Sequence, residues 1–256
     1  MGNTITFLGS AGARIMVANQ IQPSGGLWLN MNGTEVLIDP GPGSIVQSTK
    51  RKLRAEKLSA IILSHRHLDH SGDVNIMVEA MTQGGFTPHG RFFAPSDAFG
   101  PEPVLFSYLR EYIDGVEILQ EGKSYSVDNL SFSTPVRHIH GVETYGMKFT
   151  VDEGTFSYIA DGRYFDGLCQ NYNADLLIIN VVFLTPRPEV PHLSLPDVRH
   201  IIKELKPKTA ILTHFGMNIW RAKPWEIAEE LSQEIGIKVM AARAGMQFDL
   251  SQLQNV

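Results

Sequence analysis

An apolar run and a cluster of possible metal ligands adjoin in residues 60–70, Ala60-Ile61-Ile62-Leu63-Ser64-His65-Arg66-His67-Leu68-Asp69-His70. The first four residues of this stretch are apolar, which predicts a buried strand, and the strand runs directly into four ligand-type side chains within six positions. Imidazole and carboxylate together suit zinc, iron or manganese better than calcium or magnesium. A histidine-rich surface turn is the alternative, but this window holds three of the 9 histidines in the chain. The stretch therefore predicts a metal site on a loop at a sheet edge.

The spacing within this cluster favours two metal ions over one. On such a loop His65 and His67 can point to one side while Asp69 and His70 turn to the other. Two ions need further ligands, and candidates lie close to the ends of later predicted strands, each followed by a turn that contains glycine. These candidates are His140, Asp161 and His214. Loops held by a rigid sheet are where functional sites usually lie, which supports all three.

Short β-rich runs recur along the chain, and helices are fewer. A helix is predicted after His70, where residues 74, 77, 78 and 81 are apolar at helical spacing. A second is predicted after Ser194, which begins a capping box, and a third from about Pro224 to Glu234. No helical pattern directly follows Gly9-Ser10-Ala11-Gly12, which reads as a tight turn near the mouth of the site. The order of elements suits a sheet core with helices outside.

Composition narrows the class of protein. The 256 residues are 43% apolar and 19% charged, which suits one globular domain spanning residues 1–256. A net charge of −5 makes a long nucleic acid an unlikely partner, because non-specific binding to nucleic acid needs a basic surface. No apolar run approaches the roughly 20 residues of a membrane helix. With Cys169 as the single cysteine and no leader pattern, a cytoplasmic location is expected.

Five motifs stand in the order in which metallo-β-lactamase-fold hydrolases carry them. They span about residues 5 to 216 and are Leu37-Ile38-Asp39-Pro40-Gly41, the His-x-His-x-Asp-His cluster, His140, Asp161 and Leu212-Thr213-His214-Phe215. The chain therefore resembles that family of metal-dependent hydrolases. The resemblance implies an α+β fold, a four-layer αβ/βα sandwich.

The same resemblance implies how the ligands divide between two divalent ions. One ion would be held by His65, His67 and His140, the other by Asp69, His70 and His214, with Asp161 bridging them. Asp39 would be a buried support rather than a ligand. Zinc is the expected ion, with manganese and iron left open. Family members are often dimers, so a homodimer is also left open.

Departures from subfamily patterns narrow the chemistry. His70 differs from many true β-lactamases, which argues against antibiotic hydrolysis, and His67 differs from the glutamate of the di-iron flavoprotein relatives, which argues against redox chemistry. The stretch from His140 to Gly146 resembles a motif of ribonuclease Z and related phosphodiesterases, and it favours His140 over His138 as the ligand. Residues 81–130 lack the long basic arm of ribonuclease Z, so a small anionic substrate is expected.

These features predict a hydrolase in which a metal-bridging hydroxide attacks a phosphodiester or related phosphorylated compound. We assign catalytic roles to Asp69, as a ligand, and to His192, as general acid or as a clamp on a substrate oxygen. A structural histidine packed near Ser194 is the alternative for His192. Two other functions stay open: a lactone or thioester hydrolase, and a metal-binding sensor or scaffold without turnover.

Overall fold

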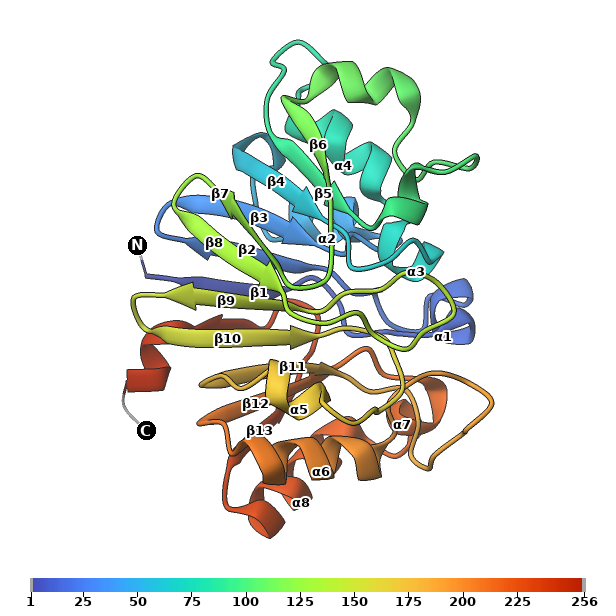
Figure 1. Cartoon of the computed structure of the whole chain (residues 1–256), viewed down its shortest axis with the longest axis vertical. Helices are drawn as coiled ribbons and strands as arrows, with labels where there is room; N and C mark the ends of the chain where they lie inside the picture. The colour runs from blue at the N-terminus through green and yellow to red at the C-terminus, as the bar shows by residue number, and fades with distance from the viewer. Residues whose placement is uncertain (1, 255–256) are drawn as a thin grey trace.

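The computed structural model describes residues 2–254 and places two seven-stranded sheets at its centre (Figure 1). The first sheet has the spatial order β14 (Gln247–Asp249), β1 (Thr4–Phe7), β2 (Leu27–Met31), β3 (Thr34–Ile38), β4 (Leu58–Ile62), β5 (Arg91–Ala94) and β6 (Gly115–Ile118). The second has the order β13 (Lys238–Ala241), β12 (Thr209–Thr213), β11 (Leu176–Asn180), β10 (Gly154–Ile159), β9 (Met147–Val151), β8 (Leu130–Thr134) and β7 (Lys123–Val127).

The inner faces of the two sheets form one apolar core. Phe7 and Phe93 from the first sheet belong to the same buried cluster as Phe149 and Phe156 from the second. The rings of Phe149 and Phe156 stack with centroids 4.4 Å apart. Each fully buried aromatic ring of this kind stabilises the fold by roughly 1.5–3 kcal/mol relative to exposure. This core fixes the distance between the two sheets.

Helices cover both outer faces. A second apolar cluster joins the first sheet to α2 (Ser44–Lys50), α4 (Val74–Met81) and the short helix η3 (Ser107–Tyr112). A third joins the second sheet to α5 (Leu168–Asn171), α6 (Leu195–Leu205), α7 (Met217–Arg221) and α8 (Pro224–Ile235). The layers are therefore helix, sheet, sheet, helix, as Figure 1 shows, and the predicted αβ/βα sandwich is confirmed. None of the described helices is long and apolar enough to cross a membrane.

The helices with strong sequence signals form where they are predicted. Ser194 and Asp197 make the capping box of α6, and Val198, Ile201 and Ile202 form its buried face. The expectation that no helix follows Gly12 is wrong, because α1 (Arg14–Ala18) begins there. This helix has five residues and buries only Met16, so it leaves no apolar periodicity to detect. The predicted loop at the cluster is partly helical too, since α3 (Leu68–Ser71) turns there.

Strand direction decides where the ligands meet. β3 and β4 are parallel neighbours in the first sheet, and β10, β11 and β12 are parallel neighbours in the second. Parallel strands bring their carboxyl ends to one edge, which is where open α/β sheets bind ligands. Asp39 and His65 lie beyond the ends of β3 and β4, and Asp161 and His214 lie beyond the ends of β10 and β12. Both sheets thus deliver polar side chains to the same end of the sandwich.

Candidate metal centre

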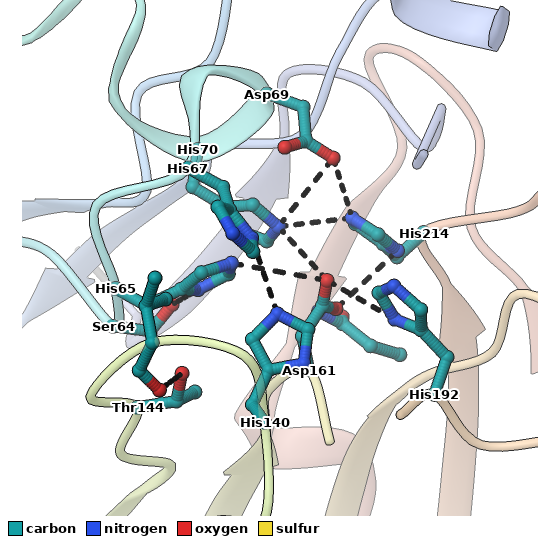
Figure 2. Close-up of polar contacts among 12 residues, drawn as sticks. Ser64, His65, His67, Asp69, His70, His140, Thr144, Asp161, His192 and His214 are labelled. Atoms are coloured by element: carbon teal, nitrogen blue, oxygen red, sulfur yellow. Dashed lines mark hydrogen bonds and ion pairs between the residues drawn. The ribbon is translucent and has the colours of Figure 1, made fainter. Parts of the chain in front are cut away.

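All seven ligand-type residues predicted from the sequence come together at this end (Figure 2). They divide into two groups, in each of which one ligand atom per residue lies within 4.8 Å of the others. We call His65, His67 and His140 the histidine group. We call Asp69, His70, Asp161 and His214 the acidic group.

The histidine group contains only imidazoles. His140 Nε2 lies 3.1 Å from His67 Nδ1, and the rings of His65 and His67 have centroids 4.8 Å apart. His140 comes from the connection between β8 and β9, where its Nδ1 donates to the carbonyl of Pro191 at 2.9 Å. Because a carbonyl only accepts, the proton of His140 lies on Nδ1 and the lone pair of Nε2 faces the group.

The acidic group is closer together and more buried. His70 Nε2 lies 2.9 Å from His214 Nε2, and His214 Nε2 lies 3.3 Å from Asp69 Oδ2. Atoms that each bind a tetrahedral ion at 2.0–2.1 Å are about 3.3 Å apart, so these separations suit a shared ion. The amide of Ala13 donates to Asp69 Oδ2 at 3.2 Å and holds this carboxylate from the side of α1.

Asp161 lies between the two groups. Its Oδ2 is 3.5 Å from His70 Nε2 in the acidic group and 3.9 Å from His65 Nε2 in the histidine group. One carboxylate oxygen is thus within reach of ligand atoms from both groups. This is the position that a bridging carboxylate would need.

A buried carboxylate behind the site orients the imidazoles. Asp39 Oδ2 accepts from Ser64 Oγ at 2.6 Å and from His70 Nδ1 at 3.0 Å. Since the Ser64 hydroxyl has one proton, which it donates to Asp39, it must accept from His65 Nδ1, 3.0 Å away. Both His65 and His70 therefore have Nδ1 bonded from behind and turn Nε2 toward the site, the arrangement that metal-binding histidines share.

The environment of His65 Nε2 indicates that a metal ion fits the histidine group. This nitrogen is buried, and within residues 2–254 it has no hydrogen-bond partner. An orphaned buried acceptor costs about 1–3 kcal/mol unless something satisfies it. A divalent cation held by His65, His67 and His140 would satisfy this lone pair. The donor set of imidazoles and carboxylates accordingly suits zinc, manganese or iron.

The two groups differ in their electrostatics. Burial lowers the pKa of His65 well below its ordinary value, and burial also lowers the pKa of His67. For His70 burial acts in the same direction, but the carboxylates of Asp161, Asp39 and Asp69 outweigh it and raise its pKa well above the ordinary value. The acidic group therefore attracts positive charge even before an ion is bound, and the histidine group does not.

His192 and His138 lie at different depths. His192 Nδ1 is 3.4 Å from Asp161 Oδ2, and its ring lies 5.0 Å from that of His140, so it faces the site. Burial lowers the pKa of His192 to about 4. His138 instead donates from Nδ1 to the Asp161 carbonyl at 3.0 Å and accepts at Nε2 from the Tyr172 hydroxyl at 2.8 Å, behind the ligands. The structure thus places His140, and not His138, beside His67.

Backbone conformation at the site is unusual at two ligand-bearing turns. Asp39 and His214 both have positive φ, 50° and 60°, which L residues seldom adopt outside functional or tightly packed positions. Gly12 lies directly against His214, and a Cβ there would come within 2.1 Å of His214 Nδ1. The Gly9–Gly12 turn thus shapes the acidic group by close approach of its backbone.

Sequence reasoning missed three residues that hold the ligands in place. Ser64 lies between Asp39 and His65, as described above. Tyr158 donates its hydroxyl proton to Asp39 Oδ2 at 2.9 Å, and Asn180 donates to Asp161 Oδ1 at 2.8 Å. A polar residue at the end of the apolar strand β11 was the only available signal for Asn180, and Tyr158 has no local signal.

Comparison with known proteins agrees with this geometry. Residues 34–215 match the beta-lactamase superfamily domain, so the chain belongs to that superfamily. An uncharacterized protein of Methanocaldococcus jannaschii, MJ1374, is 30% identical over 96% of this chain and 94% of its own length. A probable metallo-hydrolase of Bacillus subtilis, YhfI, is 27% identical over 72% of this chain and 77% of its own length.

Solved structures share the fold. The crystal structure of YhfI superposes with a TM-score of 0.80 at 23% identity, covering 97% of this chain and 100% of that one. A diphosphatase of the PhnP family gives 0.71 at 21% identity over 96% and 97%. The short form of human tRNase Z gives 0.68 at 17% identity over 96% and 99%. The chain is a metallo-β-lactamase-fold hydrolase related to the ribonuclease Z-like enzymes.

Proposed function

We propose that this protein is a dinuclear metal-dependent phosphodiesterase-like hydrolase acting on a small anionic substrate. The observation that carries the proposal is the position of Asp161 Oδ2 between two complete ligand groups. Two divalent ions held there would supply a hydroxide nucleophile at neutral pH and stabilise negative charge on the substrate. Zinc is the ion we expect.

Charge balance favours an anionic substrate. Asp69 and Asp161 offset only part of the positive charge that two divalent ions would bring. Arg187 adds to this field: its Cζ lies 4.9 Å over the ring of Phe183, which lies 6.0 Å from the ring of His192. Within the described residues no carboxylate pairs with Arg187, so an anion near Phe183 would meet an uncompensated positive charge. The diphosphatase and tRNase Z with the same fold act on phosphate compounds, according to their names, which supports this class.

His192 is the side chain that we assign to the leaving group. Its Nδ1 is buried, faces Asp161 and has no hydrogen-bond partner among residues 2–254. A substrate oxygen entering between the two groups would meet this nitrogen, which would hold the oxygen or pass it a proton.

The test is hydrolysis by metal-loaded protein of bis(p-nitrophenyl) phosphate, a lactone and a thioester, side by side. Preference for the phosphodiester supports the proposal. Preference for the lactone or thioester would move the function to carbon esters, and binding without turnover of any of them would make the protein a sensor or scaffold.

His192→Ala should retain two metal equivalents and lose about 10²–10⁴-fold in kcat on the phosphodiester. The matched control is His200→Ala, which removes an exposed histidine on α6 and should change neither quantity. Full turnover by His192→Ala with normal metal content would exclude the role assigned to His192.

A further inference from the structure

A closed set of buried hydrogen bonds connects the ligands of the two groups from behind. Asn180, at the end of β11, donates from Nδ2 both to Asp161 Oδ1 at 2.8 Å and to the Tyr158 hydroxyl at 3.1 Å. Tyr158, in β10, donates in turn to Asp39 Oδ2 at 2.9 Å. Asp39 already holds His70 directly and His65 through Ser64.

The direction of every bond in this set is forced. Carboxylates only accept, so the nitrogen of the Asn180 amide must face Asp161, and the hydroxyl of Tyr158 must point its proton at Asp39. The hydroxyl then has lone pairs left to accept from Asn180. Neither side chain can reverse without placing an acceptor against an acceptor.

Asn180 also gives the two oxygens of Asp161 different surroundings. Oδ1 accepts from the amide, whereas Oδ2 faces His65 Nε2 at 3.9 Å and His70 Nε2 at 3.5 Å. A free carboxylate could turn and present both oxygens to the acidic group. The histidine group would then lose the carboxylate oxygen that lies 3.9 Å from His65 Nε2.

From this geometry we propose that Asn180 and Tyr158 are positioning residues that reserve Asp161 Oδ2 for the histidine group as well as the acidic group. The inference rests on the two-ion site of the proposed function. It goes beyond that function because it assigns the sharing of Asp161 to two side chains that touch neither an ion nor a substrate.

The burial of Asn180 supports a positioning role over a purely structural one. Asn180 is 3% exposed, and in the part of the chain that the structure describes no donor reaches its Oδ1. An unpaired buried amide oxygen destabilises the fold, so packing alone favours an apolar side chain at this position. The polar residue therefore has a role other than filling space.

The experiment compares Asn180→Leu and Tyr158→Phe with wild type, using stepwise Mn²⁺ binding measured by chelator competition. Loss of a residue that orients a ligand typically lowers metal affinity about 10–100-fold. We expect this loss for the second equivalent in Asn180→Leu, with the first changed by less than about threefold, and a smaller loss in Tyr158→Phe. The electron paramagnetic resonance signal of a coupled Mn²⁺ pair should weaken in the same order.

Tyr125→Phe is the matched control, since it removes a buried tyrosine hydroxyl that bonds to the backbone of Ile118 and Gln120, away from the site. It should bind two ions as wild type does. The thermal midpoints of the metal-free variants report whether they fold, and a merely structural role would lower these midpoints while leaving the stepwise metal affinities of the folded protein unchanged.

The outcomes separate the two claims. Two equivalents in wild type with unchanged stepwise affinities and coupling in Asn180→Leu and Tyr158→Phe would overturn the positioning role. Fewer than two equivalents in wild type would instead overturn the dinuclear site itself. If Asn180→Leu does not fold, Tyr158→Phe decides alone, because it keeps the ring and removes one oxygen.

Discussion

The histidine group and the acidic group lie side by side, yet they would bind a cation for different reasons. The acidic group has two carboxylates of its own, Asp69 and Asp161, and Asp39 directly behind His70. The histidine group has three imidazoles and no carboxylate of its own, and Asp161 Oδ2 lies 3.9 Å from His65 Nε2. Coulombic attraction favours cation binding in the acidic group, whereas cation binding in the histidine group would depend on sharing the Asp161 carboxylate. If the proposed function holds, the shared carboxylate of Asp161 would therefore decide whether this end of the sandwich binds one ion or two.

Asp161→Asn breaks this dependence and should have the largest effect. Without the shared charge, affinity for the ion of the histidine group should fall by at least about 100-fold. Turnover should fall on the order of 10³-fold, since one source of charge stabilisation is lost. Metal analysis and kinetics check both, with the exposed Asp152→Asn as a control of equal charge change. An Asp161→Asn protein that still binds two ions as wild type does would contradict the comparison.

Removing one imidazole from each group sharpens the comparison. His214→Ala should lower affinity for the first ion by about 10–100-fold, or roughly 1.4–2.8 kcal/mol. His67→Ala should leave the first ion bound as in wild type and weaken only the second. Titration calorimetry with Zn²⁺ distinguishes the two steps. The reverse order of effects would mean that the histidine group fills first.

Two glycines provide a milder version of the same test. A Cβ on Gly12 would come within 2.1 Å of His214 Nδ1, whereas a Cβ on Gly141, next to His140, meets nothing within 4 Å. Gly12→Ala should therefore destabilise the protein by about 1–3 kcal/mol and weaken the first ion. Gly141→Ala should stay within about 0.5 kcal/mol of wild type. Chemical denaturation and metal titration check the pair, and equal effects would argue against close packing at Gly12.

The smallest effect is expected for Asp175, a carboxylate outside both groups. Although burial raises the pKa of Asp175, hydrogen bonds from Thr155 and the charge of Lys208 hold it below the ordinary value. A lowered pKa stabilises the fold above the ordinary pKa of Asp, about 3.9, and this contribution disappears as the pH falls through the folded-state value. Asp175→Asn should cost about 1 kcal/mol at pH 7.

This cost should vanish in acid, and the binding of both ions should be unchanged. Unfolding at pH 7 and near pH 3 measures the first point, and metal titration measures the second. A change in metal affinity would show that carboxylates outside the site also control it.

Short sequence patterns predict much of this fold. The apolar strand before His65, the capping box at Ser194 and the glycines after the ligands are short-range features, and the elements formed where they predicted. The strand β7 has a weak apolar pattern in the sequence, because only Tyr125 and Val127 face inward and the residues between them are polar. β14 has three residues, too few to show a period.

The ligand types, their order along the chain and the resemblance to a family could all be predicted from local sequence. Which atoms face each other follows from the packing of the two sheets: His140 lies beside His67, Asp161 between the groups, and Tyr158 and Asn180 behind them. The physical reason is distance along the chain. Propensity and periodicity act over a few residues, whereas Tyr158 reaches Asp39 across 119 positions, a contact created by the packing of two sheets. The side chains that divide one carboxylate between two groups are therefore invisible until the sheets are in place.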